Sequence, residues 1–307
     1  MRVSNPGVRG GSTEKAMAPN EFFDDQLQRL RSGGFGAGAL AEFGRQLWRS
    51  SRASADARPE LQRELRLMRW GGVVVSLLVG ALCAASGVSV LPALALPVLW
   101  WLILCAWVSV ELGLVRHPIT GAPSPRIGPA NLMTLYRGWA AAPVLAIGLG
   151  VGGPTPLWVV LCIAGGLTDL LDGTVAVRLH HESRLGRLLD PVLDAFFSSA
   201  AAVSLAHWRL LPEWLAVVVA LRYFLPVAGG LALLFIRGRT LPVQHTPWGQ
   251  RSTLAIGIVL LVSWMSSVLA VPSAVLVGLY VLALVTMALA LTGILRRAGA
   301  AEAGGAT

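Results

Sequence analysis

The sequence is short of the residue types that soluble and secreted proteins depend on. Only 16 of its 307 residues are Asp or Glu, Lys15 is the single lysine, and 13% of all residues are charged. That is about half the share usual in soluble domains. Its cysteines, Cys83, Cys105 and Cys162, all fall in apolar runs, where a thiol behaves as a small hydrophobe. The sequence therefore indicates neither a disulfide framework nor a thiolate metal site.

Long apolar runs take the place of the missing charge. Hydrophobic residues make up 55% of the chain, and the mean hydropathy is +0.66. Between Trp70 and Leu295 the runs are about 20 residues long, the length at which a helix crosses about 30 Å of hydrocarbon. Strands of a membrane barrel are shorter and alternate in polarity, so helices are expected. The sequence predicts an all-α integral membrane protein with about eight spans, at 70–89, 92–115, 131–151, 155–177, 187–206, 213–236, 253–271 and 273–295.

The net charge of +9 consists almost wholly of arginine, and its distribution predicts an orientation. Twelve basic residues precede the first expected span, and further arginines lie in alternate connections and at the C-terminus, whereas the intervening connections contain only Arg209. By the positive-inside rule, both termini are expected to be cytoplasmic. This distribution favours anionic membrane lipid, and not nucleic acid, as the partner of the positive charge.

The N-terminal segment, residues 1–69, is expected to be cytoplasmic and arginine-rich. Residues 1–20 lack the apolar core of a signal peptide, so we expect this segment to be retained. After a glycine-rich linker at 32–36, helices are expected near 38–52 and 59–68. Their mixture of large apolar residues and arginines suits a helix lying on an anionic leaflet, with a weakly ordered tail as the alternative.

Four aspartates stand out because they lie at the ends of two consecutive apolar spans. Asp169 and Asp172 are spaced i, i+3, and Asp190 and Asp194 are spaced i, i+4, so each pair lies on one face of its helix. A carboxylate in a membrane helix costs several kcal/mol unless its surroundings are wet, paired or filled with ions. If the two helices form a hairpin, all four carboxylates converge at the cytoplasmic membrane surface.

Four converging carboxylates indicate bound cations. Hard oxygen ligands without a Cys or His cluster suit Mg²⁺ or Mn²⁺, and such metals suggest a phosphate-bearing substrate. The alternative is that the aspartates pair with neighbouring arginines and only anchor the helix ends, although exposed ion pairs contribute little. Small residues around the aspartates would allow close helix packing or the approach of a ligand.

The aspartates and their surroundings resemble the signature of the CDP-alcohol phosphotransferase family, D-x2-D-G-x2-A-R-x8-G-x3-D-x3-D. The spacing of Asp169, Asp172, Gly173, Ala176, Gly186, Asp190 and Asp194 matches it throughout, whereas Val177 stands at the arginine position and Arg178 follows it. The stretch Asn131–Arg137 also looks like the P-N-x-x-T-x-x-R opening of the first family helix, with Ala130 at the proline position.

The resemblance implies a six-helix catalytic membrane domain at 131–295. Two extra transmembrane helices within 70–115 would precede it, and a short cytoplasmic tail, 296–307, would follow. Family members transfer a phosphatidyl or related group from a CDP-linked lipid, here CDP-diacylglycerol, to an alcohol and release CMP. The chain would accordingly act in phospholipid biosynthesis at the cytoplasmic face, and relatives are commonly homodimers.

The resemblance also assigns expected roles to individual residues. A two-metal site would use Asp169, Asp172, Asp190 and Asp194, and Asp194 would also act as the catalytic base. The nucleotide would contact Gly173, Ala176, Gly186, Thr134 and Arg178. The acceptor would contact Arg222, which has a counterpart in phosphatidylglycerophosphate synthase relatives. Arg187 and Arg237 would add to a cytoplasmic anion funnel for the acceptor, with ordinary positive-inside charges as the alternative. Arg222 is singled out because it lies inside an apolar span; pairing with Glu213 is the alternative.

The acceptor is the least determined part of the function. The segment Leu189-Asp190-Pro191-Val192-Leu193-Asp194 resembles phosphatidylglycerophosphate and cardiolipin synthases, which favours glycerol 3-phosphate, and inositol phosphate is an alternative. Those relatives usually have lysine after the last aspartate, where this chain has Ala195. Together with Val177, this leaves open a non-catalytic membrane scaffold or regulator. An ion or proton transporter is less favoured, because transporter sites usually lie near the bilayer midplane.

Overall fold

In the computed structural model of the chain, the described backbone is helical apart from short connections and one isolated β-bridge. The structure describes residues 30, 32–116, 122–179, 183–237 and 247–304; within these ranges the side chains of 169–179, 231, 233–237, 247 and 294–304 are not described. The helices are α2 (Ala37–Asp56), α3 (Pro59–Ala85), α4 (Val90–Val110), the 3₁₀ helix η1 (Leu112–Leu114), α5 (Pro129–Gly150), α6 (Pro156–Leu179), α7 (Arg184–His207), α8 (Glu213–Arg237), α9 (Pro247–Met265) and α10 (Ser273–Gly304).

The chain divides into two compact units, Met1–Phe43 and Gly44–Thr307. In the described part of the first unit, a tight turn precedes α2. The backbone N–H of Phe35 donates to Leu30 O at 3.1 Å, and Phe35 has a positive φ of 54°. The second unit contains the rest of α2 and all the later helices.

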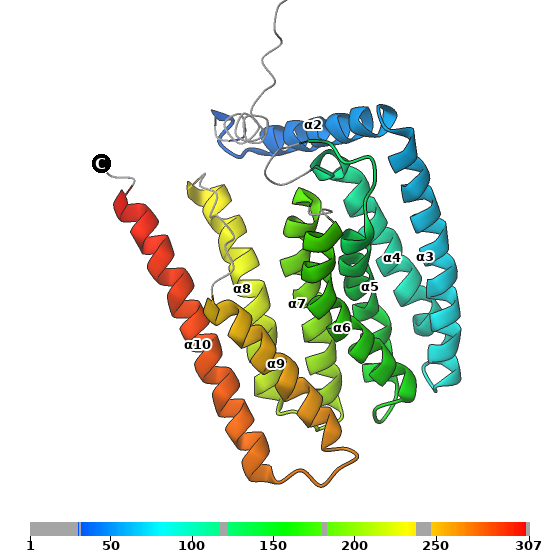
Figure 1. Cartoon of the computed structure of the whole chain (residues 1–307), viewed down its shortest axis with the longest axis vertical. Coiled ribbons are helices and arrows are strands. Elements are labelled where there is room, and N and C mark those ends of the chain that lie inside the picture. Colours follow the sequence, from blue (N-terminus) through cyan, green and yellow to red (C-terminus); the bar gives the residue numbers. More distant parts are fainter. Residues whose placement is uncertain (1–29, 31, 117–121, 180–182, 238–246, 305–307) are drawn as a thin grey trace, which may run out of the picture. The chain divides into compact units, whose positions relative to one another are not determined.

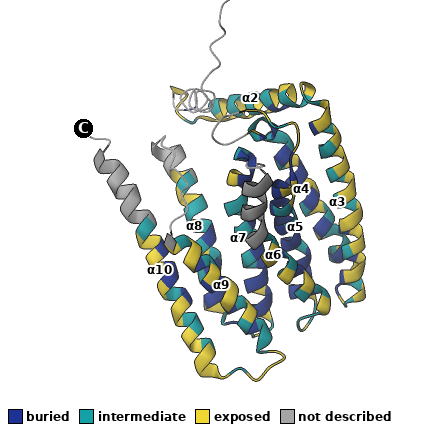
Figure 2. Ribbon diagram, viewed as in Figure 1, coloured by how far each residue is buried: buried dark blue, intermediate teal, exposed yellow. Residues whose placement is uncertain are grey.

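In the second unit, α5 is the central helix (Figure 1). It packs against α4, α6 and α7, while α3 pairs with α4, α7 with α8, and α9 with α10. Small residues allow this close packing: a Cβ added at Gly148 of α5 would lie 1.9 Å from Ser204 Oγ of α7. α5 is mostly buried, whereas the outward faces of α3 and α10 expose large apolar side chains (Figure 2).

Helices occur at all eight expected positions, and this confirms the all-α prediction. Among the described residues, six helices are long and apolar enough to cross a membrane: Pro59–Ala85, Val90–Val110, Pro129–Gly150, Arg184–His207, Glu213–Gly230 and Ser273–Gly293. Pro156–Thr168, the part of α6 with described side chains, is a shorter apolar helix. α9 has 19 residues and begins with the polar stretch around Gln250 and Arg251, which lowers its mean hydropathy.

Several expected helix boundaries were wrong. The helices expected at 59–68 and 70–89 form one continuous helix, α3, which runs through Arg69 and the following Gly71 and Gly72 without a break. α4 ends at Val110, earlier than expected, and α9 covers Pro247–Met265 in place of 253–271. Apolar composition predicts that a helix exists, whereas its ends depend on local hydrogen bonds.

Polar contacts connect the segment before α3 to η1 and the connection between α4 and α5. The guanidinium of Arg58 donates to the carbonyl oxygens of Val115 at 3.0 Å, Ser124 at 2.7 Å and Leu112 at 3.2 Å. Burial, together with the positive charge of Arg116, lowers the pKa of Arg58, but an arginine remains charged at neutral pH.

Side chains of α3 also join the α3–α4 hairpin to α5. Glu64 Oε2 of α3 accepts a hydrogen bond from the backbone N–H of Ile127 at 2.8 Å, immediately before α5. Within the helices, Trp139 Nε1 of α5 donates to Ser76 Oγ of α3 at 2.9 Å. The α3–α4 hairpin is therefore fastened to α5 both at its start and along its length.

Candidate active site

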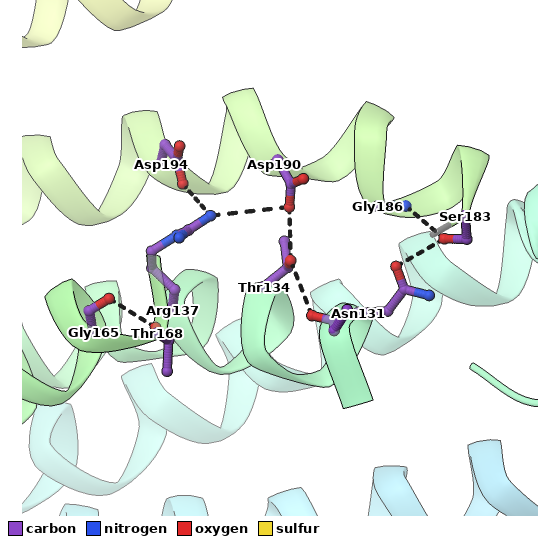
Figure 3. A network of polar contacts seen from close by, with 10 residues as sticks. Asn131, Thr134, Arg137, Gly165, Thr168, Ser183, Gly186, Asp190 and Asp194 are labelled. Carbon is purple, nitrogen blue, oxygen red and sulfur yellow. Dashed lines mark hydrogen bonds and ion pairs between the residues drawn. The ribbon is translucent and has the colours of Figure 1, made fainter. Parts of the chain in front are cut away.

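Two of the four aspartates lie on the face of α7 that meets α5 (Figure 3). Thr134 Oγ1 donates to Asp190 Oδ1 at 2.6 Å. Arg137 Nη2 lies 2.5 Å from Asp194 Oδ1 and 3.9 Å from Asp190 Oδ1. The i, i+4 pair of aspartates on α7 thus faces an i, i+3 pair on α5: Thr134 is hydrogen-bonded to Asp190, and Arg137 lies nearest to Asp194.

The exposure of these charges is unequal. The side chain of Arg137 is only 3% exposed, while Asp194 is 23% exposed and Asp190 is 38% exposed. A guanidinium buried in an apolar helix is costly unless it is paired, and here two carboxylates face it. Arg137 therefore lies on the buried side of the two carboxylates, and each carboxylate stays partly accessible to a ligand.

A second network fixes the N-terminus of α7 against α5. Ser183 is the N-cap of α7: its hydroxyl accepts from the backbone N–H of Gly186 at 3.0 Å and donates to Asn131 Oδ1 at 2.8 Å. Asn131 Nδ2 in turn donates to the carbonyl oxygen of Ile127. This cap satisfies an otherwise unpaired helix donor and fixes the start of α7 relative to α5.

Gly186 is required for this network for steric reasons. A Cβ added there would lie 2.6 Å from Asn131 Oδ1, closer than real Cβ atoms approach. The structure therefore gives Gly186 a packing role at the α5–α7 contact. Its expected contact with a nucleotide stays a prediction.

The Gly186→Ala substitution is expected to lower the free energy of unfolding by about 1–3 kcal/mol, the usual cost of overpacking. The added methyl would displace Asn131 and weaken the Ser183 cap. Thermal unfolding of the purified protein in detergent measures this effect. Gly257→Ala is the matched control, because a Cβ at Gly257 meets nothing within 4 Å. Equal melting temperatures for both variants and the unmodified protein would contradict the packing role.

The other half of the predicted aspartate cluster lies in the last turns of α6. This stretch contains Asp169, Asp172, Gly173, Ala176 and Arg178, whose side chains are outside the described residues. Among the side chains that are described, no group of three or more His, Cys, Asp or Glu could hold a metal. Convergence of all four carboxylates therefore stays a prediction.

The structure describes two of the three arginines expected to bind the acceptor. Arg222 of α8 donates through Nε to Ser252 Oγ at 3.0 Å and through Nη2 to the carbonyl oxygen of Gly249 at 3.4 Å. These partners are on α9, and its guanidinium carbon lies 5.4 Å from the ring centroid of Tyr223. Arg187 is exposed in the first turn of α7, and the side chain of Arg237 is outside the described residues.

No role was predicted from the sequence for Arg137, Asn131 or Ser183. A usable signal existed for Arg137, because it lies inside an apolar helix just as Arg222 does. The role of Ser183 depends on its hydrogen bond to Asn131, which lies 52 residues away in the chain, and the sequence has no local signal for such a contact.

The end of the second unit opposite Asp190 and Asp194 contains a cavity of about 470 Å³. Its lining includes Arg209, Glu213, Ser266 and Tyr280, and none of the predicted site residues. The cavity is therefore separate from the carboxylate site.

Comparison with known proteins decides the family. A family model described as CDP-alcohol phosphatidyltransferase matches residues 128–294, more than half of the chain. The chain belongs to the CDP-alcohol phosphatidyltransferase family. With this membership and its candidate spans, it is an integral membrane protein.

Similar proteins of this family are named as synthases and transferases of phospholipids. A cardiolipin synthase (CMP-forming) from Streptomyces coelicolor is 41% identical over 73 residues, 23% of this chain and 34% of that protein. The Homo sapiens cardiolipin synthase (CMP-forming) is 33% identical over 147 residues, 41% of this chain and 44% of that protein. A CDP-diacylglycerol--glycerol-3-phosphate 3-phosphatidyltransferase from Bacillus subtilis is 35% identical over 65 residues, 21% of this chain and 34% of that protein.

These matches cover less than half of each relative's own length. No solved structure matches the chain. The region matched to the CDP-alcohol phosphatidyltransferase family begins at residue 128, just before α5, so α3 and α4 lie outside it.

Proposed function

We propose that the chain is a metal-dependent phosphatidyltransferase of phospholipid biosynthesis. It transfers the phosphatidyl group of a CDP-linked lipid, CDP-diacylglycerol, to an alcohol and releases CMP. The observation that supports this most directly is the pair Asp190 and Asp194, which is held from α5 by Thr134 and Arg137 while one edge stays accessible. Family membership supplies the reaction class.

The donor chemistry of this pair fits Mg²⁺ or Mn²⁺. Asp190 and Asp194 offer hard carboxylate oxygens that remain partly exposed, and we propose Asp169 and Asp172 as the further ligands. When bound, two such ions would stabilise the attacking and leaving oxygens and the charge that develops on the departing CMP. Removal of divalent ions by a chelator is accordingly expected to stop CMP release.

Asp194 is the proposed general base. It accepts the proton of the acceptor hydroxyl while that oxygen forms a bond to the phosphatidyl phosphorus and the bond from phosphorus to the CMP oxygen breaks. Arg137 orients the carboxylate through its 2.5 Å contact, so the other edge of Asp194 is directed to the acceptor. Thr134 holds Asp190 in the same way.

The remaining assignments concern the two substrates. We propose that the nucleotide lies along Gly173, Ala176 and Arg178 of α6, near Thr134 and Gly186, and that Arg222, Arg187 and Arg237 attract the acceptor. Because Arg222 is hydrogen-bonded to Ser252 of α9, acceptor binding would exchange or share that contact.

We propose a glycerol hydroxyl next to a phosphate as the acceptor group. Glycerol 3-phosphate is favoured by the Leu189–Asp194 segment and appears in the name of the Bacillus subtilis relative. Phosphatidylglycerol contains the same group, and its use as acceptor would give cardiolipin, the product in the names of the other relatives.

The proposed arrangement in the membrane follows the arginine distribution. Both termini and the Asp190–Asp194 site face the cytoplasm, residues 131–295 form the catalytic domain, and 70–115 contributes the two additional transmembrane helices. A homodimer is the proposed assembly.

A CMP-release screen tests the proposal. Purified protein with Mg²⁺ or Mn²⁺ and CDP-diacylglycerol is expected to release CMP when glycerol 3-phosphate or phosphatidylglycerol is added, and not with serine or inositol. Inositol phosphate is included as the alternative acceptor. Folded protein that releases no CMP with any acceptor would rule out the enzyme and favour a non-catalytic family member.

A further inference from the structure

The helix α4 lies outside the matched family region, yet one of its side chains contacts α5 beside the candidate site. Trp100 Nε1 donates to the carbonyl oxygen of Gly138 at 2.7 Å, although the two residues are 38 positions apart. Gly138 directly follows Arg137, the partner of Asp194. The hydrogen bond therefore fixes the backbone of α5 at the residue next to the site arginine.

The same indole also contacts α7. The ring centroids of Trp100 and Phe196 are 4.8 Å apart with an interplanar angle of 59°, a tilted arrangement that aromatic pairs favour. Phe196 follows Asp194 by two positions and packs in turn against Phe224 of α8, with centroids 5.4 Å apart. Trp100 thus touches both helices that provide the Arg137–Asp194 pair.

At this level α5 and α7 are as close as their side chains allow. A Cβ added at Gly138 would lie 2.7 Å from Leu193 Cδ2, and Leu193 directly precedes Asp194. The separation of the two helices is therefore set beside the ion pair, at the place where Trp100 binds. A displacement of about 1 Å in a reacting group can cost about 100-fold in rate, so a contact of this kind affects catalysis.

The neighbouring tryptophan has a different role. Trp101 Nε1 donates to the carbonyl oxygen of Arg69 at 3.0 Å, on α3, so it joins the two helices of the α3–α4 hairpin to each other. Trp101 thus stabilises the α3–α4 hairpin itself. Trp100, by contrast, contacts α5 and α7, which belong to the matched family region.

We propose that Trp100 is a positioning residue for the Arg137–Asp194 pair and that α4 supplies it to the catalytic helices from outside the matched region. This inference rests on the proposed function of Asp194 as the base. Its contribution is expected in the chemical step, because the indole contacts the backbone and the aromatic side chain beside the pair.

Conservative substitutions test the proposal. Trp100→Phe keeps an aromatic ring for Phe196 but removes the N–H donor to Gly138, and is expected to lower kcat about three- to tenfold, the equivalent of one hydrogen bond. The KM for CDP-diacylglycerol should stay within about twofold, because ground-state binding is not affected. Trp100→Ala, which removes both contacts, should lower kcat further. The matched control Trp101→Phe should leave kcat unchanged, and equal effects of Trp100→Phe and Trp101→Phe would overturn the proposal.

A second measurement does not require turnover. Thermal unfolding of Trp100→Phe, Arg137→Lys and the double variant forms a double-mutant cycle. The shifts in Tm are expected to be non-additive, because Trp100 binds the carbonyl of Gly138, the residue next to Arg137. The same cycle with Trp101→Phe should be additive. If the unmodified protein releases no CMP, the proposed function fails and this cycle alone decides: additive shifts with Trp100→Phe overturn the positioning role.

Discussion

Replacement of Asp194 with asparagine is expected to lower kcat for acceptor-dependent CMP release by about 10²- to 10⁴-fold, the usual contribution of a general base. Asparagine has nearly the same shape, but its amide cannot take the proton of the acceptor hydroxyl. It also removes the negative charge that Arg137 Nη2 faces at 2.5 Å. The measurement is steady-state CMP release with saturating CDP-diacylglycerol and acceptor.

Glu213→Gln is the control for the loss of a carboxylate. Glu213 is exposed in the first turn of α8, and it lines the cavity away from the site. This variant is expected to retain the unmodified rate. An Asp194→Asn protein that is folded and turns over within threefold of the unmodified rate would exclude Asp194 as the base.

Replacement of Arg137 with methionine is expected to have the second-largest effect, on both activity and stability. Removing one partner of a fully buried ion pair costs about 3–5 kcal/mol. We expect about 2 kcal/mol here, because the carboxylates of Asp190 and Asp194 are partly exposed and water can screen them. The rate of CMP release should also fall by about 100-fold, since the base loses the group that orients it. Thermal unfolding and steady-state kinetics measure the two effects.

Arg209→Met provides the matched control for Arg137→Met. Arg209 is an exposed arginine in the connection between α7 and α8 and lies outside the site. It is expected to unfold and turn over as the unmodified protein does. If Arg137→Met did the same, the ion pair would have no role in holding the carboxylates.

The helices could be predicted because their signals are local. A run of about 20 apolar residues must satisfy its backbone polar groups internally in lipid, and this requirement alone gives a helix. The boundaries were less predictable: α3 begins at Pro59 and continues through the predicted break at Arg69, and even Gly71 and Gly72 do not end it.

The candidate site was predictable only in part. The i, i+4 spacing of Asp190 and Asp194 predicted that they share a face of one helix, and the structure confirms this; that the shared face of α7 meets α5 was not predicted. Arg137 as their partner did not follow from any spacing. Neither did the packing role of Gly186, which depends on the side chain of Asn131 in another helix.

By itself, the sequence determined that the chain is a helical membrane protein, and it predicted that paired aspartates on successive helices form a site for phosphate chemistry. Periodicity and hydropathy act within one helix, so both conclusions are properties of short segments. Only the tertiary structure decided that Arg137 and Thr134 hold the carboxylates, and that Trp100 of α4 touches both helices around them. The physical reason is that the register between helices depends on many small contacts, such as that of Gly138 with Leu193, which no single segment contains.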